Sequence, residues 1–154
     1  MMNSLKDNLL RHPFFKELSA EHFDIILRNT QMLTFDVGER IFKEDEEANM
    51  FYIIEHGKVA IELFTPRRGY VCMQTLGENE LLGWSAIISP YLREFDGCCV
   101  EKSRIIAIDG KVLRQEMEEN PKFGYELLKR FSYIVVRRLK QTRLQLADLY
   151  GSSS

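Results

Sequence analysis

The sequence predicts an α+β protein in which an antiparallel β barrel of the jelly-roll type is flanked by helices at both ends. Many short apolar runs separated by glycine-containing turns fill residues 31–109, a pattern typical of such barrels. Apolar residues recur at helical spacing before this region, up to about residue 30, and again over residues 110–150. With 154 residues, the chain is expected to form one domain over residues 1–154.

The first thirty residues are expected to form two short helical pieces. Pro13 separates them, because proline disrupts the interior of a helix. Ser19 is a typical N-cap for the second piece, and His22 takes the position three residues later. The apolar stripe that should face the core consists of Leu18, Phe23, Ile26 and Leu27.

The barrel region contains strands of two kinds. Residues 51–54 are continuously apolar, as expected for a strand that is buried on both faces. Residues 58–63 alternate apolar and other side chains, as expected for a half-buried strand. Gly57 and Gly69 are expected in the turns that connect these strands, and residues 44–47 form an acidic, solvated loop.

A helix is expected over residues 110–120, and Pro121 is expected to start a second helix that continues to about residue 150. At 1.5 Å per residue this second helix is roughly 45 Å long, which exceeds the height of a small barrel. Its residues at alternating spacings of four and three form a coiled-coil seam with polar interruptions, and we expect a parallel homodimer through it. The seam contains Leu128, Ser132, Val135, Leu139, Thr142, Leu146 and Leu149. Alternatively, the helix packs only on its own barrel.

The composition excludes several classes of protein. A net charge of −2 and a pI near 6.0 argue against a dedicated nucleic-acid binder, and no apolar run is long enough to span a membrane. The three cysteines, Cys72, Cys98 and Cys99, lack the spacing of a metal site and suit the reducing cytoplasm. No nucleophile and base stand at a useful spacing, so an enzyme is not expected.

The candidate site lies in residues 81–96. The apolar end of a strand, Leu81 and Leu82, leads into Gly83, and a short helical turn is expected over residues 84–88. Glycine lets the backbone approach a ligand closely, and the amides of a first helical turn can bind an anion. Arg93 follows and can donate to a phosphate through two nitrogens. We call residues 83–86 together with Arg93 the cradle; the alternative is an ordinary connection between strands.

The chain resembles the cyclic-nucleotide-binding domains of the catabolite activator protein, kinase regulatory subunits and gated channels. The resemblance begins with Leu10, the run His12-Pro13-Phe14-Phe15, Leu18 and Ser19. It continues with Gly38, Glu39, Ile41, Phe42, Glu44, Ala48, the run 51–54, Gly57 and Val59, and ends with residues 103–109 and Asn120-Pro121. It covers nearly the whole chain and implies the same fold.

The family's phosphate-binding cassette falls on the cradle, so the resemblance implies a cyclic nucleotide (cAMP or cGMP) or a related small anion as ligand. The implied ligand-binding residues are Gly83, Trp84, Ser85, Ala86, Arg93 and Phe95. Trp84 stands where the family has a ribose-binding glutamate, and Phe95 stands where it has a small alanine. A tryptophan cannot accept a hydrogen bond from a ribose hydroxyl.

Two functions therefore remain open. In the first, the chain is a regulatory ligand-sensing module that signals through its dimeric helix. In the second, Trp84 and Phe95 fill the nucleotide pocket that the resemblance implies, and the chain is a dimeric scaffold for an unknown protein partner. Because the chain ends at Ser154 without a helix-turn-helix, direct DNA binding is not expected.

The sequence also leads to expectations for where two side chains of the cradle lie. We expect the ring of Trp84 over or inside the cradle mouth. We expect Arg93 in a polar cleft, unburied when no ligand is bound, or else paired with a carboxylate such as Glu94 or Asp96.

Overall fold

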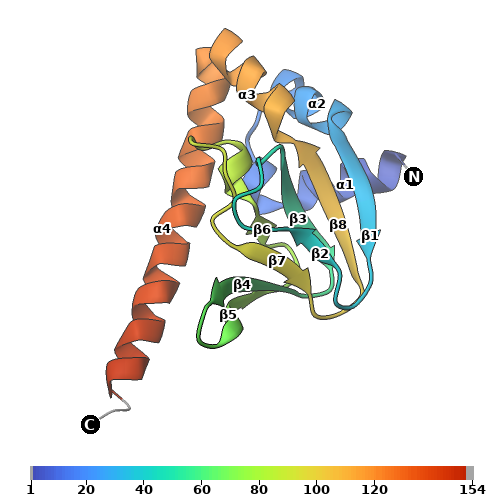
Figure 1. Ribbon diagram of the computed structural model, residues 1–154. Helices are drawn as coiled ribbons and strands as arrows, with labels where there is room; N and C mark the ends of the chain where they lie inside the picture. Colours follow the sequence, from blue (N-terminus) through green and yellow to red (C-terminus); the bar gives the residue numbers. More distant parts are fainter. Residues whose placement is uncertain (1, 152–154) are drawn as a thin grey trace.

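The computed structural model describes residues 2–151 and has the predicted architecture, two packed antiparallel sheets with helices at both ends (Figure 1). One sheet has the strand order β1-β8-β3-β6 and the other β2-β7-β4-β5, and all pairings are antiparallel. The strands are β1 Thr30–Phe35, β2 Arg40–Phe42, β3 Met50–His56, β4 Val59–Thr65, β5 Gly69–Leu76, β6 Leu81–Leu82, β7 Asp96–Cys99 and β8 Ser103–Asp109. The prediction of an antiparallel jelly roll is confirmed.

The N-terminal helices are α1 Met2–Arg11, the single 3₁₀ turn η1 Pro13–Phe15, and α2 Ala20–Arg28. Ser19 caps α2, since its hydroxyl accepts a hydrogen bond from the His22 amide at 3.2 Å. His12 caps η1 in the same way, because its Nδ1 accepts from the Phe14 amide at 3.1 Å. The opposite nitrogen of the ring, Nε2, lies 2.5 Å from the carbonyl oxygen of Asn79 and fastens this segment to the sheet.

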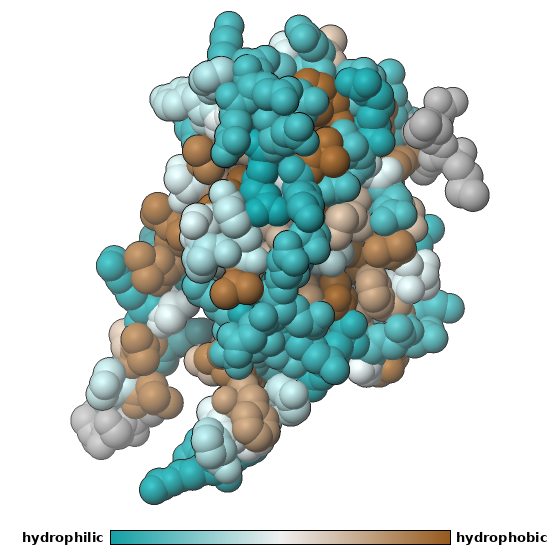
Figure 2. Space-filling model, turned by 45° about the horizontal axis from the view of Figure 1, so that its top comes forward, coloured by the Kyte–Doolittle hydropathy of each residue, from teal (hydrophilic) through white to brown (hydrophobic). Residues whose placement is uncertain are grey.

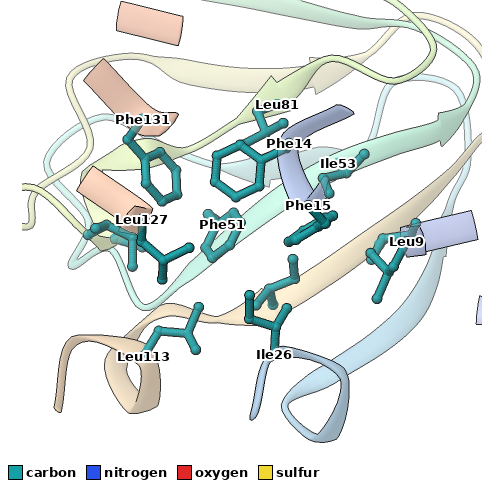
Figure 3. Close-up of a cluster of buried hydrophobic side chains, with 14 of the residues drawn as sticks. Leu9, Phe14, Phe15, Ile26, Phe51, Ile53, Leu81, Leu113, Leu127 and Phe131 are labelled. Atoms are coloured by element: carbon teal, nitrogen blue, oxygen red, sulfur yellow. The ribbon is translucent and has the colours of Figure 1, made fainter. Parts of the chain in front are cut away.

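The core has two layers, which explains the continuously apolar β3. Along this strand Phe51 and Ile53 face the helices, whereas Tyr52 and Ile54 face the space between the sheets. On the helical side, the rings of Phe14 and Phe51 both contact Phe131 edge-on, with centroids 5.0 and 5.2 Å from its own (Figure 3). A buried phenylalanine stabilises a fold by about 1.5–3 kcal/mol, so this cluster attaches the C-terminal helix firmly to the barrel.

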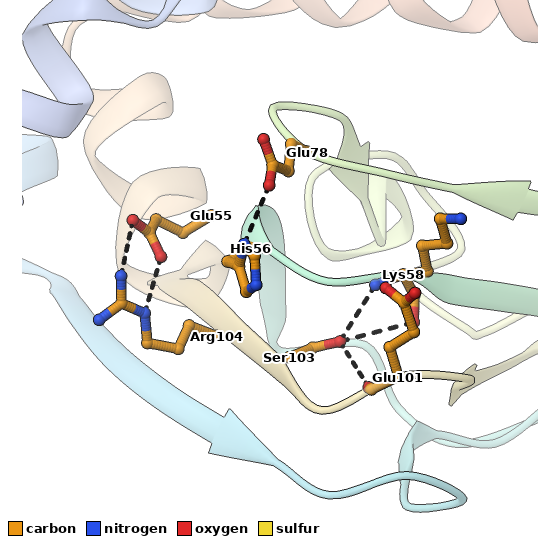
Figure 4. Close-up of polar contacts among 7 residues, drawn as sticks. All are labelled: Glu55, His56, Lys58, Glu78, Glu101, Ser103 and Arg104. Atoms are coloured by element: carbon orange, nitrogen blue, oxygen red, sulfur yellow. Dashed lines mark hydrogen bonds and ion pairs between the residues drawn. The ribbon is translucent and has the colours of Figure 1, made fainter.

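The turn between β3 and β4 shows why Gly57 is required. Its φ of +115° suits glycine, and a Cβ at this position would lie 2.1 Å from Oγ of Ser103. That hydroxyl accepts from the amide of Lys58 at 3.2 Å and donates to the carbonyl of Glu101 at 2.9 Å (Figure 4). The hydroxyl of Ser103 therefore stabilises this turn through two hydrogen bonds.

Two helices complete the chain, α3 Gly110–Glu119 and α4 Pro121–Gly151, and α4 has the predicted length. The inner face of α4 is fully buried at Phe123, Leu127 and Phe131. Its C-terminal half extends past the barrel along the β4–β5 hairpin (Figure 1), where Gln141 accepts from Gln74 at 2.6 Å.

The predicted seam lies on another face of α4 and is largely uncovered. The side chains of Leu128, Leu139 and Leu146 are about half exposed, and Leu149 is 68% exposed. Figure 2 shows apolar side chains on the projecting end of this helix. The alternative that α4 only packs on its own barrel accounts for the inner face but leaves the seam unexplained.

His12 should make the fold sensitive to mild acid. Burial lowers the pKa of its imidazole from 6.5, with the Asn79 carbonyl acting in the opposite direction. Protonating Nδ1 would also remove the acceptor that caps η1. The unfolded chain therefore binds the proton more readily, and the free energy of unfolding should fall as the pH drops below about 6.5.

Urea melts of the wild type and His12→Asn at pH 7.0 and 5.5 check this expectation. Asparagine retains an acceptor for the Phe14 amide but does not titrate, so the variant should lose less stability between the two pH values. Equal losses in both proteins would show that His12 is not responsible.

Candidate functional site

Gly83 turns the chain from the end of β6 into a tight helical turn. Leu82 pairs with Tyr52 of β3, and Gly83 then adopts the left-handed conformation with φ +85° and ψ 36°. The following turn is the 3₁₀ helix η2, Trp84–Ala86, which is shorter than the expected turn over residues 84–88. A helix of one turn has only a small dipole, so its capacity to bind an anion depends on individual amides. In the described part of the chain the Trp84 and Ser85 amides have no hydrogen-bond partner.

Arg93 is buried, with only 4% of its surface exposed, so the expectation that it lies unburied in a polar cleft is wrong. Its Nη1 donates to the carbonyl of Gly83 at 3.1 Å, and Nη2 donates to the carbonyl of Met50 at 2.6 Å. The guanidinium carbon lies 4.3 Å from the ring centre of Phe42 and 5.7 Å from that of Tyr52. The side chain is directed inward, since its guanidinium lies beside Phe42, which belongs to the core layer between the sheets.

The close approach of Arg93 explains the glycine at position 83. A Cβ on Gly83 would lie 2.7 Å from Nη1 of Arg93, and the positive φ would strain any other residue. Both the backbone conformation and the available space therefore select glycine. This agrees with the prediction that Gly83 permits a close approach, although the group that approaches here is Arg93 itself.

The charge of Arg93 has no direct counter-ion. Among residues 5–151, whose side chains are described, no carboxylate oxygen lies within 4.0 Å of its nitrogens, and its Nε has no hydrogen-bond partner. Burial lowers the pKa of the guanidinium, and Tyr52 and Glu46 act in the opposite direction. The alternative expectation, a permanent pair with Glu94 or Asp96, is also wrong. A buried cation whose hydrogen-bond acceptors are two neutral carbonyls is energetically unfavourable.

Asp96 belongs to a different cluster on the outer face of its sheet. It pairs in register with Glu62 of β4, whereas the neighbouring Phe95 packs into the interior. Its Oδ1 accepts from the amide of Glu44 at 2.8 Å, and its Oδ2 lies 3.1 Å from Nη1 of Arg40. Asp96 is thus turned away from the cradle and does not oppose an anion there.

Aromatic side chains fill the space beside Arg93. The ring of Phe95 lies 5.9 Å from that of Phe42, and Phe42 in turn stacks on Tyr52 at 6.1 Å with an interplanar angle of 17°. The interior beside Arg93 is therefore apolar and occupied by aromatic rings, which agrees with the alternative that Phe95 fills this space. Ala86 is also fully buried, but it belongs to the core layer that faces the helices.

Trp84 points elsewhere. It is half-buried, packs against the core layer that faces the helices, and lies under Arg138 of α4, whose guanidinium carbon is 5.1 Å from the centre of its ring system. The expectation that Trp84 fills the interior is therefore wrong, because Phe42, Tyr52 and Phe95 occupy it. The expectation that its ring lies over the cradle mouth stays a prediction. Sequence reasoning missed Arg138, although its position four residues after Ile134 places it on the inner face of α4.

A hollow of about 1560 Å³ lies between the segment after α1, the β5–β6 turn and α4, and neither Gly83 nor Arg93 lines it. Within the described residues, no three histidine, cysteine or acidic side chains are placed to bind a metal ion. None of the described helices combines the length and apolarity needed to cross a membrane.

Burial of Arg93 predicts that its truncation damages the fold. Arg93→Ala should lower the free energy of unfolding by about 2–4 kcal/mol, because it leaves a cavity and removes two hydrogen bonds. Arg93→Met should cost about 1 kcal/mol or less, since it fills the same space and removes a buried charge. Denaturant unfolding measures both changes. Equal destabilisation by the two variants would show that filling this space does not compensate for the loss of the guanidinium.

The sequence is similar to those of known proteins. The family model for the cyclic nucleotide-binding domain matches residues 32–120. The CRP-like cAMP-activated global transcriptional regulator of Mycobacterium tuberculosis is 26% identical over 141 residues, which cover 92% of this chain and 61% of that protein. The chain thus spans about 61% of the length of this curated relative.

Solved structures share the fold. A cyclic nucleotide-binding domain from Methylobacillus flagellatus superimposes with a TM-score of 0.78 at 15% identity, covering 96% of this chain and 83% of that one. The catabolite activator protein of Thermus thermophilus superimposes with a TM-score of 0.69 at 22% identity, covering 90% of this chain and 63% of that one. Because the family model matches residues 32–120, more than half of the chain, and the fold is the same jelly roll, we conclude that the chain belongs to the cyclic nucleotide-binding domain family.

Proposed function

We propose that the chain is a regulatory, non-enzymatic module that binds a cyclic nucleotide or a related small anion at the cradle. The observation that carries this proposal is the buried guanidinium of Arg93, which has no carboxylate within 4.0 Å in the described part of the chain. A phosphate between this guanidinium and the amides of Trp84 and Ser85 would compensate the charge. The mycobacterial relative is named for its activation by cAMP, which supports a ligand of this class.

The two kinds of donor differ in charge. Any hydrogen bond to the charged phosphate contributes roughly 1.5–3 kcal/mol, but only the guanidinium also carries a full opposite charge. Arg93 should therefore dominate affinity, and its unpartnered Nε offers a donor without breaking an existing bond. The carbonyl of Gly83 also accepts from the amide of Ala86 at 3.2 Å, so it keeps a partner if Arg93 shifts toward a ligand.

A second function, a dimeric scaffold without ligand, is favoured by one observation. Phe95 and Phe42 occupy the interior beside Arg93, where the resemblance places a small residue at position 95. A base or ribose could enter only if Phe95 moved. If the chain binds a nucleotide, Phe95 must move to admit it. If the chain is a scaffold, Phe95 stays in place and no nucleotide enters.

Thermal melting and titration with cyclic AMP, cyclic GMP and other nucleotides test the proposal. A ligand at 100 times its Kd should stabilise the fold by about 2.7 kcal/mol. Arg93→Met should weaken binding about ten-fold or more, because it removes the charge-assisted bonds. Arg104→Met is the matched control, since this exposed arginine pairs with Glu55 far from the cradle.

Phe95→Ala decides between the two functions. If the interior is merely filled, the wild type should ignore every nucleotide, whereas the enlarged interior of Phe95→Ala should bind one. If the wild type already binds, Arg93→Met should weaken that binding about ten-fold or more. A wild type that binds none of the nucleotides would refute the ligand-sensing role, whether or not Phe95→Ala binds one.

We further propose that the module signals as a parallel homodimer through the seam of α4. The half-exposed leucines of the seam and the length of α4 support this assembly. A sensor needs an element that transmits the effect of ligand binding from the barrel to a partner. The helix α4 projects beyond the barrel and suits this role (Figure 1). The partner that receives the signal and the expected cytoplasmic location stay predictions.

Light scattering at micromolar concentration tests the dimer. Leu139→Glu combined with Leu146→Glu should convert a dimer into a monomer, because four carboxylates would be forced into one apolar seam. Lys129→Glu combined with Lys140→Glu is the control, since these two exposed lysines lie outside the seam on the same helix. A monomeric wild type would overturn the assignment.

A further inference from the structure

Arg138 links the long helix to the entry of the cradle. Its Nη2 donates to the carbonyl of Leu81, the first residue of β6, and its guanidinium lies over the Trp84 ring at 5.1 Å. Leu81 and Trp84 stand on either side of the Leu82–Gly83 corner. A single side chain of α4 therefore contacts the backbone before the corner and the ring after it.

The neighbouring polar contacts of α4 lead to other parts of the molecule. Gln141, one turn later, accepts from Gln74 of β5. Ile134, one turn earlier, packs into the core layer that faces the helices, to which Leu81 and Trp84 also belong, so its contact with this region is apolar packing. Gln145 donates to the carbonyl of Met73 at 3.1 Å. Among the described hydrogen bonds and ring contacts, Arg138 is the α4 residue that reaches residues 81–86.

Arg138 is held by a hydrogen bond to a carbonyl and by a contact with a ring face, without an ion pair to any carboxylate of residues 5–151. No carboxylate of residues 5–151 lies within 4.0 Å of its nitrogens, and its buried Nη1 has no hydrogen-bond partner. Burial lowers the pKa of this guanidinium, which Glu80 opposes and Arg137 reinforces. A carbonyl bond and a contact with a ring face are both directional, so a shift of the corner at Gly83 must weaken them.

We propose that Arg138 is a positioning residue that couples the conformation of the cradle turn to α4, with Trp84 as the coupling surface. The inference rests on the proposed function, because it names the route by which occupancy of the cradle would reach the helix. It also gives Trp84 a role in this chain: where the resemblance places a ribose contact, Trp84 contacts the helix instead.

Amide hydrogen exchange on the ligand-free protein tests the coupling in both directions. Arg138→Ala should speed exchange in the turn over residues 84–88 by about five- to thirty-fold, relative to peptides from β5 and β8. Arg137→Ala is the matched control, because the guanidinium of Arg137 lies over Tyr133 of α4 itself. Trp84→Leu should speed exchange of α4 around residue 138, and it should add nothing in the Arg138→Ala background.

Three results would overturn the inference. The first is equal exchange in the turn for Arg138→Ala and Arg137→Ala. The second is independent, additive effects of Trp84→Leu and Arg138→Ala. The third is acceleration of β5 and β8 peptides to the same extent, which would indicate a merely structural role. If Arg138→Ala does not fold, Arg138→Lys keeps the charge and most of the stem but loses the planar contact, so it should give a smaller acceleration confined to the same turn. Because no ligand is used, a failure here is separate from a failure of nucleotide binding.

Discussion

The guanidinium of Arg93, held inside a jelly roll by two backbone carbonyls, is the interaction on which the arrangement of the site depends. It accounts for the glycine at position 83, where any side chain would collide with Nη1. It ties β6 and the start of β3 together, since its two acceptors are the carbonyls of Gly83 and Met50. It also leaves a cation in a largely apolar interior beside Phe42, and a buried cation is energetically unfavourable without an anionic partner.

The turn at Gly83 is contacted from two sides. On its interior side it contacts Arg93, and on the other side Trp84 lies under Arg138 of α4. An arginine on each side thus contacts the segment from Leu81 to Trp84, and neither has a carboxylate within 4.0 Å in the described part of the chain. A segment held by directional contacts and without ion pairs can move when one contact changes. This property suits a sensor whose output is the position of a helix.

Local patterns were sufficient for most of the fold. The Ser19 cap, the apolar run at 51–54, the glycine turns and the Pro121 start of α4 are each determined by neighbours in sequence, and the structure has all of them. The family model matches this same barrel region, over residues 32–120.

The side chains of the site could not be placed in this way. Leu81 faces the helices and Leu82 the interior, but the left-handed Gly83 breaks the alternation, so the direction of Trp84 could not be derived from parity. The burial of Arg93 depends on Phe42 and Tyr52, which come from strands distant in sequence. The contact of Arg138 with Trp84 likewise joins two elements that no local pattern relates.

The central claim, that the buried Arg93 serves to bind an anion, is tested most directly by NMR of the Arg93 side chain. The Nε–H group has no partner in the described part of the chain, and its resonance can be assigned by comparison with Arg93→Lys. On titration with cyclic AMP, cyclic GMP or inorganic phosphate, the resonance should shift downfield and become protected from solvent exchange as the Nε–H donates to the phosphate. A resonance that stays unchanged at saturating concentrations of all three would contradict the account.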